Sequence, residues 1–164
     1  MKPALLVVDV QKEFFKSPTA AQSLDGAIEH INASIALFRR KGLPVICIQH
    51  KDEESNLIPG TVAFDLPESL KVLASDVHVI KTYGNGFNKT PLAAILKKLS
   101  IDTVIIAGYS AEYCVLSTYR GAMDLDFKPI LLRSGLASRK PRNITFVENI
   151  SDVISYGALK ALLE

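Results

Sequence analysis

Six short apolar runs, each the length of a strand, alternate along this chain with segments of helical spacing. We expect strands at residues 5–10, 43–49, 76–80, 103–107, 129–132 and 144–147. These runs are nearly continuously apolar, which is typical of parallel strands that helices cover on both faces. The pattern therefore predicts an α/β protein with three layers, α/β/α, around a mainly parallel six-stranded sheet.

The segments between the runs carry helix signals. Apolar residues recur at helical intervals over 25–41, 115–125 and 151–163. Thr90 and Pro91 supply a capping residue and a proline for the start of a further helix. The stretch 133–143 has no pattern that predicts a structure or a role.

Composition excludes several classes of function. The chain has 164 residues and 48% hydrophobic residues, enough for one domain, 1–164, with a real core. Lysine and arginine number 19 against 17 acidic residues, and they are dispersed, so no nucleic-acid partner is expected. No apolar run approaches the roughly 18 residues of a membrane helix, so no membrane partner is expected either. We expect a cytoplasmic protein whose two cysteines are free thiols.

Three side chains that can take part in acid–base or nucleophilic chemistry lie near the ends of three different predicted strands. Asp9, Lys81 and Cys114 lie at the carboxyl ends of the first, third and fourth strands. Ligands of such folds bind at this edge of the sheet. Each residue alone has an ordinary explanation as a turn carboxylate, a solvated lysine or a core thiol. Together, an acid, a cation and a thiol near a helix start, where the dipole favours a thiolate, suit nucleophilic catalysis.

Four segments in order resemble the motifs of one family, the isochorismatase-like cysteine hydrolases, which include nicotinamidases and carbamoylsarcosine amidase. Asp9–Phe14 resembles the opening D-x-Q-x-x-F, and Pro59–Thr61 resembles the P-G-T segment. Lys81 with Phe87 is similar to K-x-x-x-S-A-F, and Gly108–Val115 is similar to G-x-x-T-x-x-C-V. The resemblance implies a Rossmann-like fold with strand order 3-2-1-4-5-6.

The resemblance also implies roles for particular residues. Asp9, Lys81 and Cys114 would form a catalytic triad in which the acid accepts the thiol proton. The backbone N–H groups of Ser110 and Cys114 would form the oxyanion hole, and the Tyr109–Ser110 peptide would be cis. Departures from the family motifs occur at Ala111, in place of threonine, and at 85–86, where Asn-Gly replaces Ser-Ala.

The chain lacks the metal ligands of the nicotinamidases in this family, which use an Asp-x-His pair after the second strand. Here that stretch reads Gln-His-Lys-Asp-Glu over 49–53. We therefore expect no metal and no cofactor. His50 is either a pocket residue or a polar residue at the rim, and Cys47, within an apolar run, is expected to be core. The full set of expected pocket residues is Phe14, His50, Tyr83, Phe87, Tyr109 and Tyr113.

The sequence thus predicts a metal-independent cysteine hydrolase that cleaves a small amide or related C–N bond through a thioester on Cys114. Two alternatives stay open: a catalytically idle binding or scaffold subunit, and a cysteine enzyme that handles thiols or oxidants. A small-molecule substrate is the expected partner, and the resemblance implies a homo-oligomer.

Overall fold

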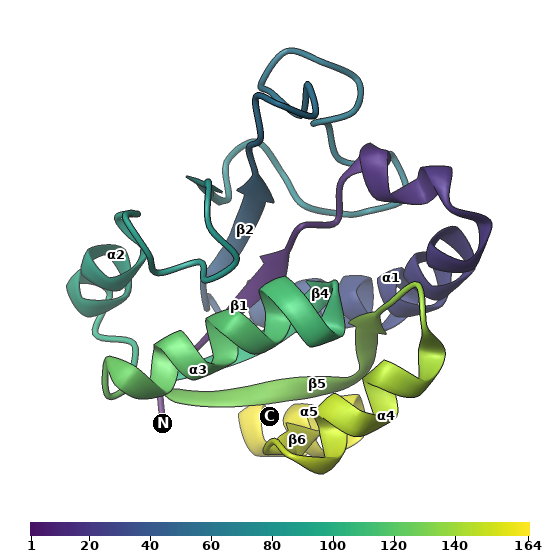
Figure 1. Cartoon of the computed structure of the whole chain (residues 1–164). Coiled ribbons are helices and arrows are strands. Elements are labelled where there is room, and N and C mark those ends of the chain that lie inside the picture. Colours follow the sequence, from purple (N-terminus) through teal and green to yellow (C-terminus); the bar gives the residue numbers. More distant parts are fainter.

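The computed structural model describes residues 1–164 and contains one six-stranded, all-parallel sheet (Figure 1). Its strand order is β3-β2-β1-β4-β5-β6, so the predicted order is confirmed. The strands are β1 (Pro3–Val8), β2 (Val45–His50), β3 (Val77–Lys81), β4 (Thr103–Tyr109), β5 (Lys128–Ala137) and β6 (Val153–Ile154).

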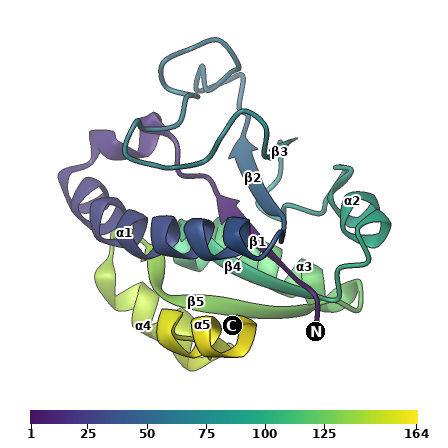
Figure 2. The ribbon, with the colours of Figure 1, turned by 180° about the vertical axis from the view of Figure 1, so that it is seen from behind.

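Helices cover both faces of the sheet, which confirms the three-layer prediction (Figures 1 and 2). One buried cluster of 19 residues joins the sheet to α1 and α5, and another of 20 joins its opposite face to α2, α3 and α4. The helices are η1 (Lys12–Lys16), α1 (Pro18–Arg40), α2 (Leu92–Lys98), η2 (Ala111–Val115), α3 (Leu116–Asp124), α4 (Pro141–Asn149) and α5 (Tyr156–Leu163). No helix combines the length and hydropathy of a membrane span.

The first helix is longer than predicted. It begins at Pro18 rather than at residue 25, because Ser17 caps it by accepting a hydrogen bond from the Ala20 N–H. Ala20 and Leu24 extend its buried face toward the sheet. The residues of this first turn have no clear helical periodicity. Ser17 followed by Pro18 is the sequence signal that indicates the start of the helix.

The predicted sixth strand at 144–147 is wrong. These residues belong to α4, which Pro141 opens at its first turn. The sixth strand is instead the two-residue β6, whose Val153 pairs with Leu131 of β5. The predicted helix over 151–163 consequently begins only at Tyr156, after Ser155 caps it.

The first and fourth strands approach unusually closely at their carboxyl ends. Val8 of β1 is paired with Gly108 of β4, whose φ of 125° favours glycine. A Cβ added at Gly108 would lie 2.0 Å from the carbonyl oxygen of Val8. The next residue along β1, Asp9, has a φ of 52°, a left-handed conformation that costs a non-glycine residue energy. Both irregularities lie where the predicted triad should assemble.

Candidate active site

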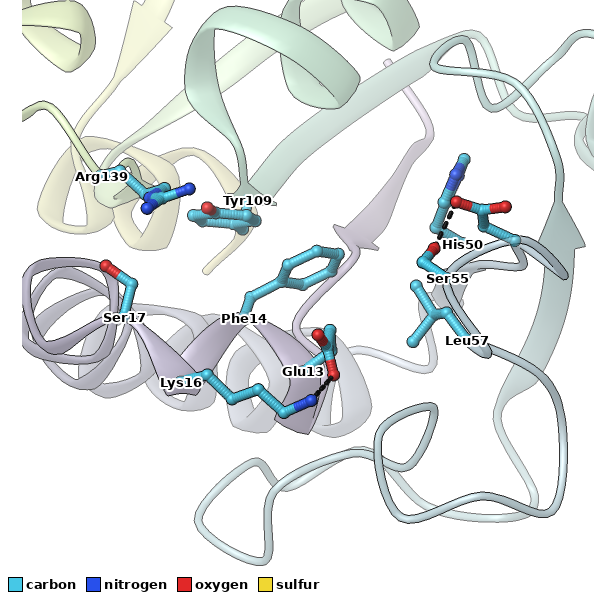
Figure 3. Close-up of a pocket in the computed structure, with 10 residues that line it drawn as sticks. Glu13, Phe14, Lys16, Ser17, His50, Ser55, Leu57, Tyr109 and Arg139 are labelled. Atoms are coloured by element: carbon cyan, nitrogen blue, oxygen red, sulfur yellow. Dashed lines mark hydrogen bonds and ion pairs between the residues drawn. The ribbon is translucent and has the colours of Figure 1, made fainter.

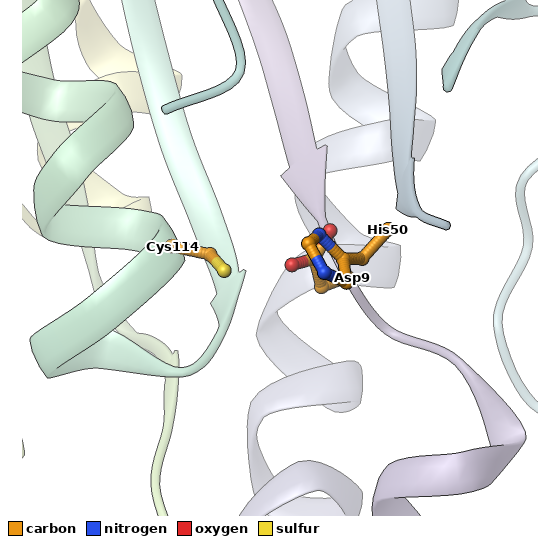
Figure 4. Close-up of side chains that lie close together, drawn as sticks. All are labelled: Asp9, His50 and Cys114. Carbon is orange, nitrogen blue, oxygen red and sulfur yellow. The ribbon is translucent and has the colours of Figure 1, made fainter. Parts of the chain in front are cut away.

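Four side chains converge on one edge of the sheet, each carried there by a different strand. Asp9 follows β1, His50 ends β2, Lys81 ends β3, and Cys114 lies in η2 directly after β4. Because the strands are parallel, their carboxyl ends share this edge. Figure 4 shows Asp9 and His50 side by side, with Cys114 facing them from the start of the helical segment.

The ammonium of Lys81 lies at the centre of the group. Its Nζ donates to Asp9 Oδ2 at 2.9 Å and to Cys114 Sγ at 3.4 Å. It also lies 3.0 Å from His50 Nδ1. Lys81 and Asp9 are almost fully buried, so their ion pair is formed away from solvent. The structure therefore brings together the three predicted catalytic residues and adds an imidazole to them.

The position of His50 is fixed through its backbone by Gln11. The side-chain amide of Gln11 donates to the His50 carbonyl at 3.0 Å and accepts from the His50 N–H at 2.8 Å. The same amide donates to the Phe64 carbonyl. This fully buried glutamine, part of the D-x-Q-x-x-F segment, thus ties β2 to the end of β1.

Burial changes the protonation chemistry of the acid and the thiol. Burial raises the pKa of Asp9 above its ordinary value, although Lys81 opposes the shift. Burial and the negative charge of Asp9 raise the pKa of Cys114 to about 12, again against Lys81. Both shifts favour the protonated forms of the two groups, and the positive charge of Lys81 opposes both shifts. A resting thiolate, which the helix start suggested, is not favoured here.

His50 is neutral in this setting. Burial, and next the positive charge of Lys81, lower its pKa below the ordinary value for histidine. A neutral imidazole can accept a hydrogen bond from the Lys81 ammonium through Nδ1. His50 therefore helps to hold the ammonium without adding a second positive charge.

The turn that carries Cys114 has the expected cis peptide between Tyr109 and Ser110. The Ser110 carbonyl accepts from the backbone N–H groups of Tyr113 and Val115, which closes the turn around the cysteine. The predicted oxyanion donors, the N–H groups of Ser110 and Cys114, thus belong to one tight turn. Their catalytic role stays a prediction.

Glu112, for which no sequence pattern predicts a role, holds the same turn in place. Its carboxylate accepts hydrogen bonds from Ser110 Oγ at 2.7 Å, Ser138 Oγ at 2.9 Å and Asn143 Nδ2 at 3.0 Å. Burial acts to raise the pKa of Glu112, but these hydrogen bonds outweigh it and lower the pKa. An ionised Glu112 therefore joins the turn around Cys114 to the loop after β5 and to α4.

Three of the four convergent residues, Asp9, His50 and Cys114, line a cavity of about 320 Å³. It shares Phe14, His50, Tyr109 and Arg139 with an outer cavity of about 500 Å³, shown in Figure 3. The rings of Phe14 and Tyr109 stack with their centroids 4.7 Å apart and form an apolar wall. Figure 3 shows Arg139 beside Tyr109, on the other side of it from Phe14. Arg139 comes from the stretch 133–143, whose role no sequence pattern predicted.

Four of the six expected pocket residues line the inner cavity: Phe14, His50, Tyr109 and Tyr113. Phe87 does not, because it packs in the core with its ring centroid 5.7 Å from that of Phe127. Tyr83 is exposed and accepts a hydrogen bond from Lys89 instead of lining the cavity. Cys47 is buried in β2, as expected.

The Asn-Gly departure at 85–86 fits its surroundings. The Gly86 N–H donates to Thr118 Oγ1 of α3 at 2.9 Å. A Cβ at Gly121 of α3 would lie 2.3 Å from the Asn85 side chain. Asn85 therefore fits against α3 because Gly121 has no side chain. The loop after β3, and with it Lys81, is therefore held against α3.

Comparisons with known proteins agree with the motifs and with the fold. The Isochorismatase domain model matches residues 3–148. The chain is 33% identical over 139 residues to the isochorismatase family protein YrdC of Bacillus subtilis, covering 84% of this chain and 74% of that protein.

Two solved structures extend this agreement to the whole fold. An isochorismatase-like hydrolase from Alkaliphilus metalliredigens superposes with a TM-score of 0.91 at 25% identity, over 100% of both chains. The N-carbamoylsarcosine amidase from Thermoplasma acidophilum superposes with a TM-score of 0.81 at 27% identity, over 94% of this chain and 95% of that one. With its sheet order, its motif residues gathered at one sheet edge and a family match across most of its length, this chain belongs to the isochorismatase family.

Proposed function

We propose that this protein is a metal-independent cysteine hydrolase that cleaves the C–N bond of a small amide. The observation that carries the proposal is the position of the Lys81 Nζ, 2.9 Å from Asp9 Oδ2 and 3.4 Å from Cys114 Sγ, beside a cavity. A base, a cation and a nucleophile are thereby available without a metal. The likeness to an N-carbamoylsarcosine amidase supports an amide-type substrate.

In the first step, Cys114 Sγ attacks the carbonyl carbon while Asp9 accepts the thiol proton. The raised pKa of Asp9 suits this acceptance and the later return of the proton. The tetrahedral oxyanion is stabilised by the N–H groups of Ser110 and Cys114. When the C–N bond breaks, Asp9 protonates the departing nitrogen, which leaves as ammonia or an amine.

In the second step, water hydrolyses the thioester on Cys114. Asp9, again a carboxylate, takes a proton from the attacking water, and the C–S bond breaks. The products are a carboxylic acid and the regenerated thiol, so the cycle needs no oxidant or reductant. Lys81 stabilises whichever of the two partners carries the negative charge.

Arg139 narrows the class of substrate. It is the cation that lines both the inner and the outer cavity. A guanidinium in such a wall is suited to bind a carboxylate with two hydrogen bonds. We therefore expect a small amide whose acyl part carries an anionic group, with its apolar portion against the Phe14 and Tyr109 rings.

The test is a screen of small amides supplied in pairs, one with a carboxylate and one without, N-carbamoylsarcosine among them. Release of ammonia or amine is measured for the natural sequence, for Cys114→Ala and for Cys47→Ala. We expect turnover that Cys114→Ala lowers by at least about 10³-fold and that Cys47→Ala leaves intact. The proposal would be refuted if turnover survives Cys114→Ala. It would also be refuted if no active substrate forms an acyl-enzyme that can be trapped on Cys114.

The homo-oligomer and the cytoplasmic location that the sequence predicts remain proposals. Tyr113, at the cavity, and Phe146, on α4, are both more than half exposed, which is compatible with a second copy covering this side. The mass in solution, measured by light scattering at micromolar concentration, tests the assembly, and a monomer would contradict it.

A further inference from the structure

The Lys81 ammonium occupies a cage of three acceptors, one for each of its N–H groups. These are Asp9 Oδ2, His50 Nδ1 and Cys114 Sγ, at 2.9, 3.0 and 3.4 Å from Nζ. A carboxylate, an imidazole and a thiol are also the three side-chain types that bind Zn²⁺. The protein thus places its own cation where three metal ligands meet.

A second observation points to a missing partner at the same place. Asp9 Oδ1 is buried and has no hydrogen-bond partner, although Oδ2 of the same carboxylate is paired with Lys81. An unpartnered buried carboxylate oxygen is costly. A cation that entered the cage would give this oxygen a ligand.

The dimensions of the cage suit a small ion. One ligand atom from each of Asp9, His50 and Cys114 lies within 4.8 Å of the others. Zinc bonds of about 2.0–2.3 Å need ligand atoms roughly 3–4 Å apart, so a small inward rotation of the side chains is enough. The three residues, which Figure 4 shows close together, all line the inner cavity, whereas Lys81 does not. An ion in the cavity can therefore reach the three ligands without passing Lys81.

We propose that Asp9, His50 and Cys114 form an inhibitory site for a thiophilic divalent cation such as Zn²⁺. The ion competes with the Lys81 ammonium for the same three side chains. On binding, the Cys114 thiol releases its proton to solvent and a sulfur–metal bond forms, with no change of oxidation state. Metal binding would then stop the proposed hydrolysis, because the nucleophile and the base are both ligands.

The choice of ion follows from the donor set. A thiolate and an imidazole favour Zn²⁺ and its analogue Co²⁺ over Mg²⁺ and Ca²⁺, which prefer oxygen ligands. The site is separate from the Asp-x-His arrangement that this sequence lacks, since it uses the nucleophile itself. Lys81 weakens binding through charge repulsion, so the site is expected to bind metal reversibly.

Cobalt provides a direct readout that does not depend on activity. Reduced protein is titrated anaerobically with Co²⁺, and the thiolate-to-cobalt charge-transfer band in the near ultraviolet is followed; Zn²⁺ is then added to displace the cobalt. We expect one equivalent to bind to the natural sequence and to Cys47→Ala, and the band to be lost in Cys114→Ser. His50→Ala is expected to weaken binding at least tenfold.

Removing the competing cation gives the sharpest contrast. The Lys81→Met variant, checked for folding by circular dichroism, is expected to bind Co²⁺ and Zn²⁺ at least tenfold more tightly than the natural sequence. Absence of the band from the natural sequence, binding by Lys81→Met alone, or a band that persists in Cys114→Ser would each overturn the proposal. Because the signal is spectroscopic, such a result leaves the amidase proposal untouched, and a failed substrate screen leaves this one untouched.

Discussion

Lys81 and Asp9 form an ion pair of 2.9 Å in which both side chains are almost completely removed from water, at 0% and 1% exposure. A buried pair of this kind is costly to break, because the partner left behind is an uncompensated charge. Its presence at the edge of the sheet, next to Cys114, couples the stability of the fold to the chemistry of the thiol.

Removing one partner of the pair should cost more stability than removing both. We expect Lys81→Met to lower the free energy of unfolding by about 3–5 kcal/mol and the double variant Asp9→Asn/Lys81→Met to recover part of that loss. Urea unfolding of the natural sequence, both single variants and the double variant gives the coupling energy. Additive effects of the two substitutions would show that the pair contributes nothing as a pair.

The same two substitutions should change the reactivity of Cys114 in opposite directions. Asp9 raises the pKa of this thiol and Lys81 lowers it. Asp9→Asn is therefore expected to speed alkylation by iodoacetamide at neutral pH, and Lys81→Met to slow it. The natural sequence, with a Cys114 pKa near 12, should react more slowly than a free thiol at neutral pH.

Peptide mass spectrometry across a pH series reads these rates, with Cys47 as an internal reference. The Cys47 pKa is also raised to about 12, first by burial and then by the negative charges of Asp9 and Asp76. Its rate should be unaffected by Lys81→Met and should rise less than that of Cys114 in Asp9→Asn, because burial is the largest cause of its shift. Rapid alkylation of Cys114 well below pH 8.5 in the natural sequence would contradict the raised pKa of this thiol.

The pH dependence of turnover follows from the raised pKa of Asp9. When the pH falls through that pKa, the Asp9 carboxylate becomes protonated. It can then no longer accept a proton from Cys114. We expect kcat/KM to fall on the acid side with a midpoint above the ordinary carboxyl value of 3.8. On the alkaline side, activity should persist through pH 8, because the Cys114 pKa lies near 12. An acid midpoint at or below 3.8 would refute Asp9 as the base.

Glu112 is expected to act as a positioning residue for the turn around Cys114. Replacing it with Gln removes the charge that Ser110, Ser138 and Asn143 now donate to. We predict a drop in kcat of about 10–100-fold with KM nearly unchanged, since Arg139 and the aromatic wall remain. Glu112→Asp should restore part of the activity. A change confined to KM, or a loss of kcat matched by global unfolding, would argue against positioning.

Arg139 should distinguish charged from neutral substrates. For an amide that carries a carboxylate, Arg139→Gln is predicted to raise KM at least about tenfold, with a much smaller effect on the matching neutral amide. Steady-state kinetics on such a pair measure the difference, and Arg142→Gln, on the same segment, is the control. Equal effects on both substrates would show that Arg139 only shapes the cavity.

Much of this architecture could be predicted from the residues. Apolar strand runs gave the layers, and motif residues at strand ends placed Asp9, Lys81 and Cys114 at one edge. Short-range patterns failed where long-range pairing decides the structure: β6 is only two residues long and exists because Leu131 lies beside Val153. Residues 144–147 look like a strand by composition, yet Pro141 starts a helix there.

The parts of the site that the sequence did not reveal depend on contacts between distant segments. Glu112 meets Ser138 and Asn143, 26 and 31 residues further along the chain. Arg139 lines the cavity from the loop after β5, which Ser138 joins to Glu112 of the turn around Cys114. Conversely, Phe87 lies close to Lys81 in sequence but turns into the core, where Phe127 provides its neighbour. No local spacing carries this information.

Gly108 sets the separation of the two strands, β1 and β4, that lead to Asp9 and to the turn around Cys114. A single methyl group at this position would collide with the Val8 carbonyl and push β1 away from β4. The displacement would pass directly to Asp9 and, through Tyr109, to the turn around Cys114. The distance between Asp9 and Cys114 therefore depends on the missing side chain of Gly108. Gly108→Ala, which changes no member of the site, is expected to move the two residues apart and so to disrupt the proposed catalytic geometry.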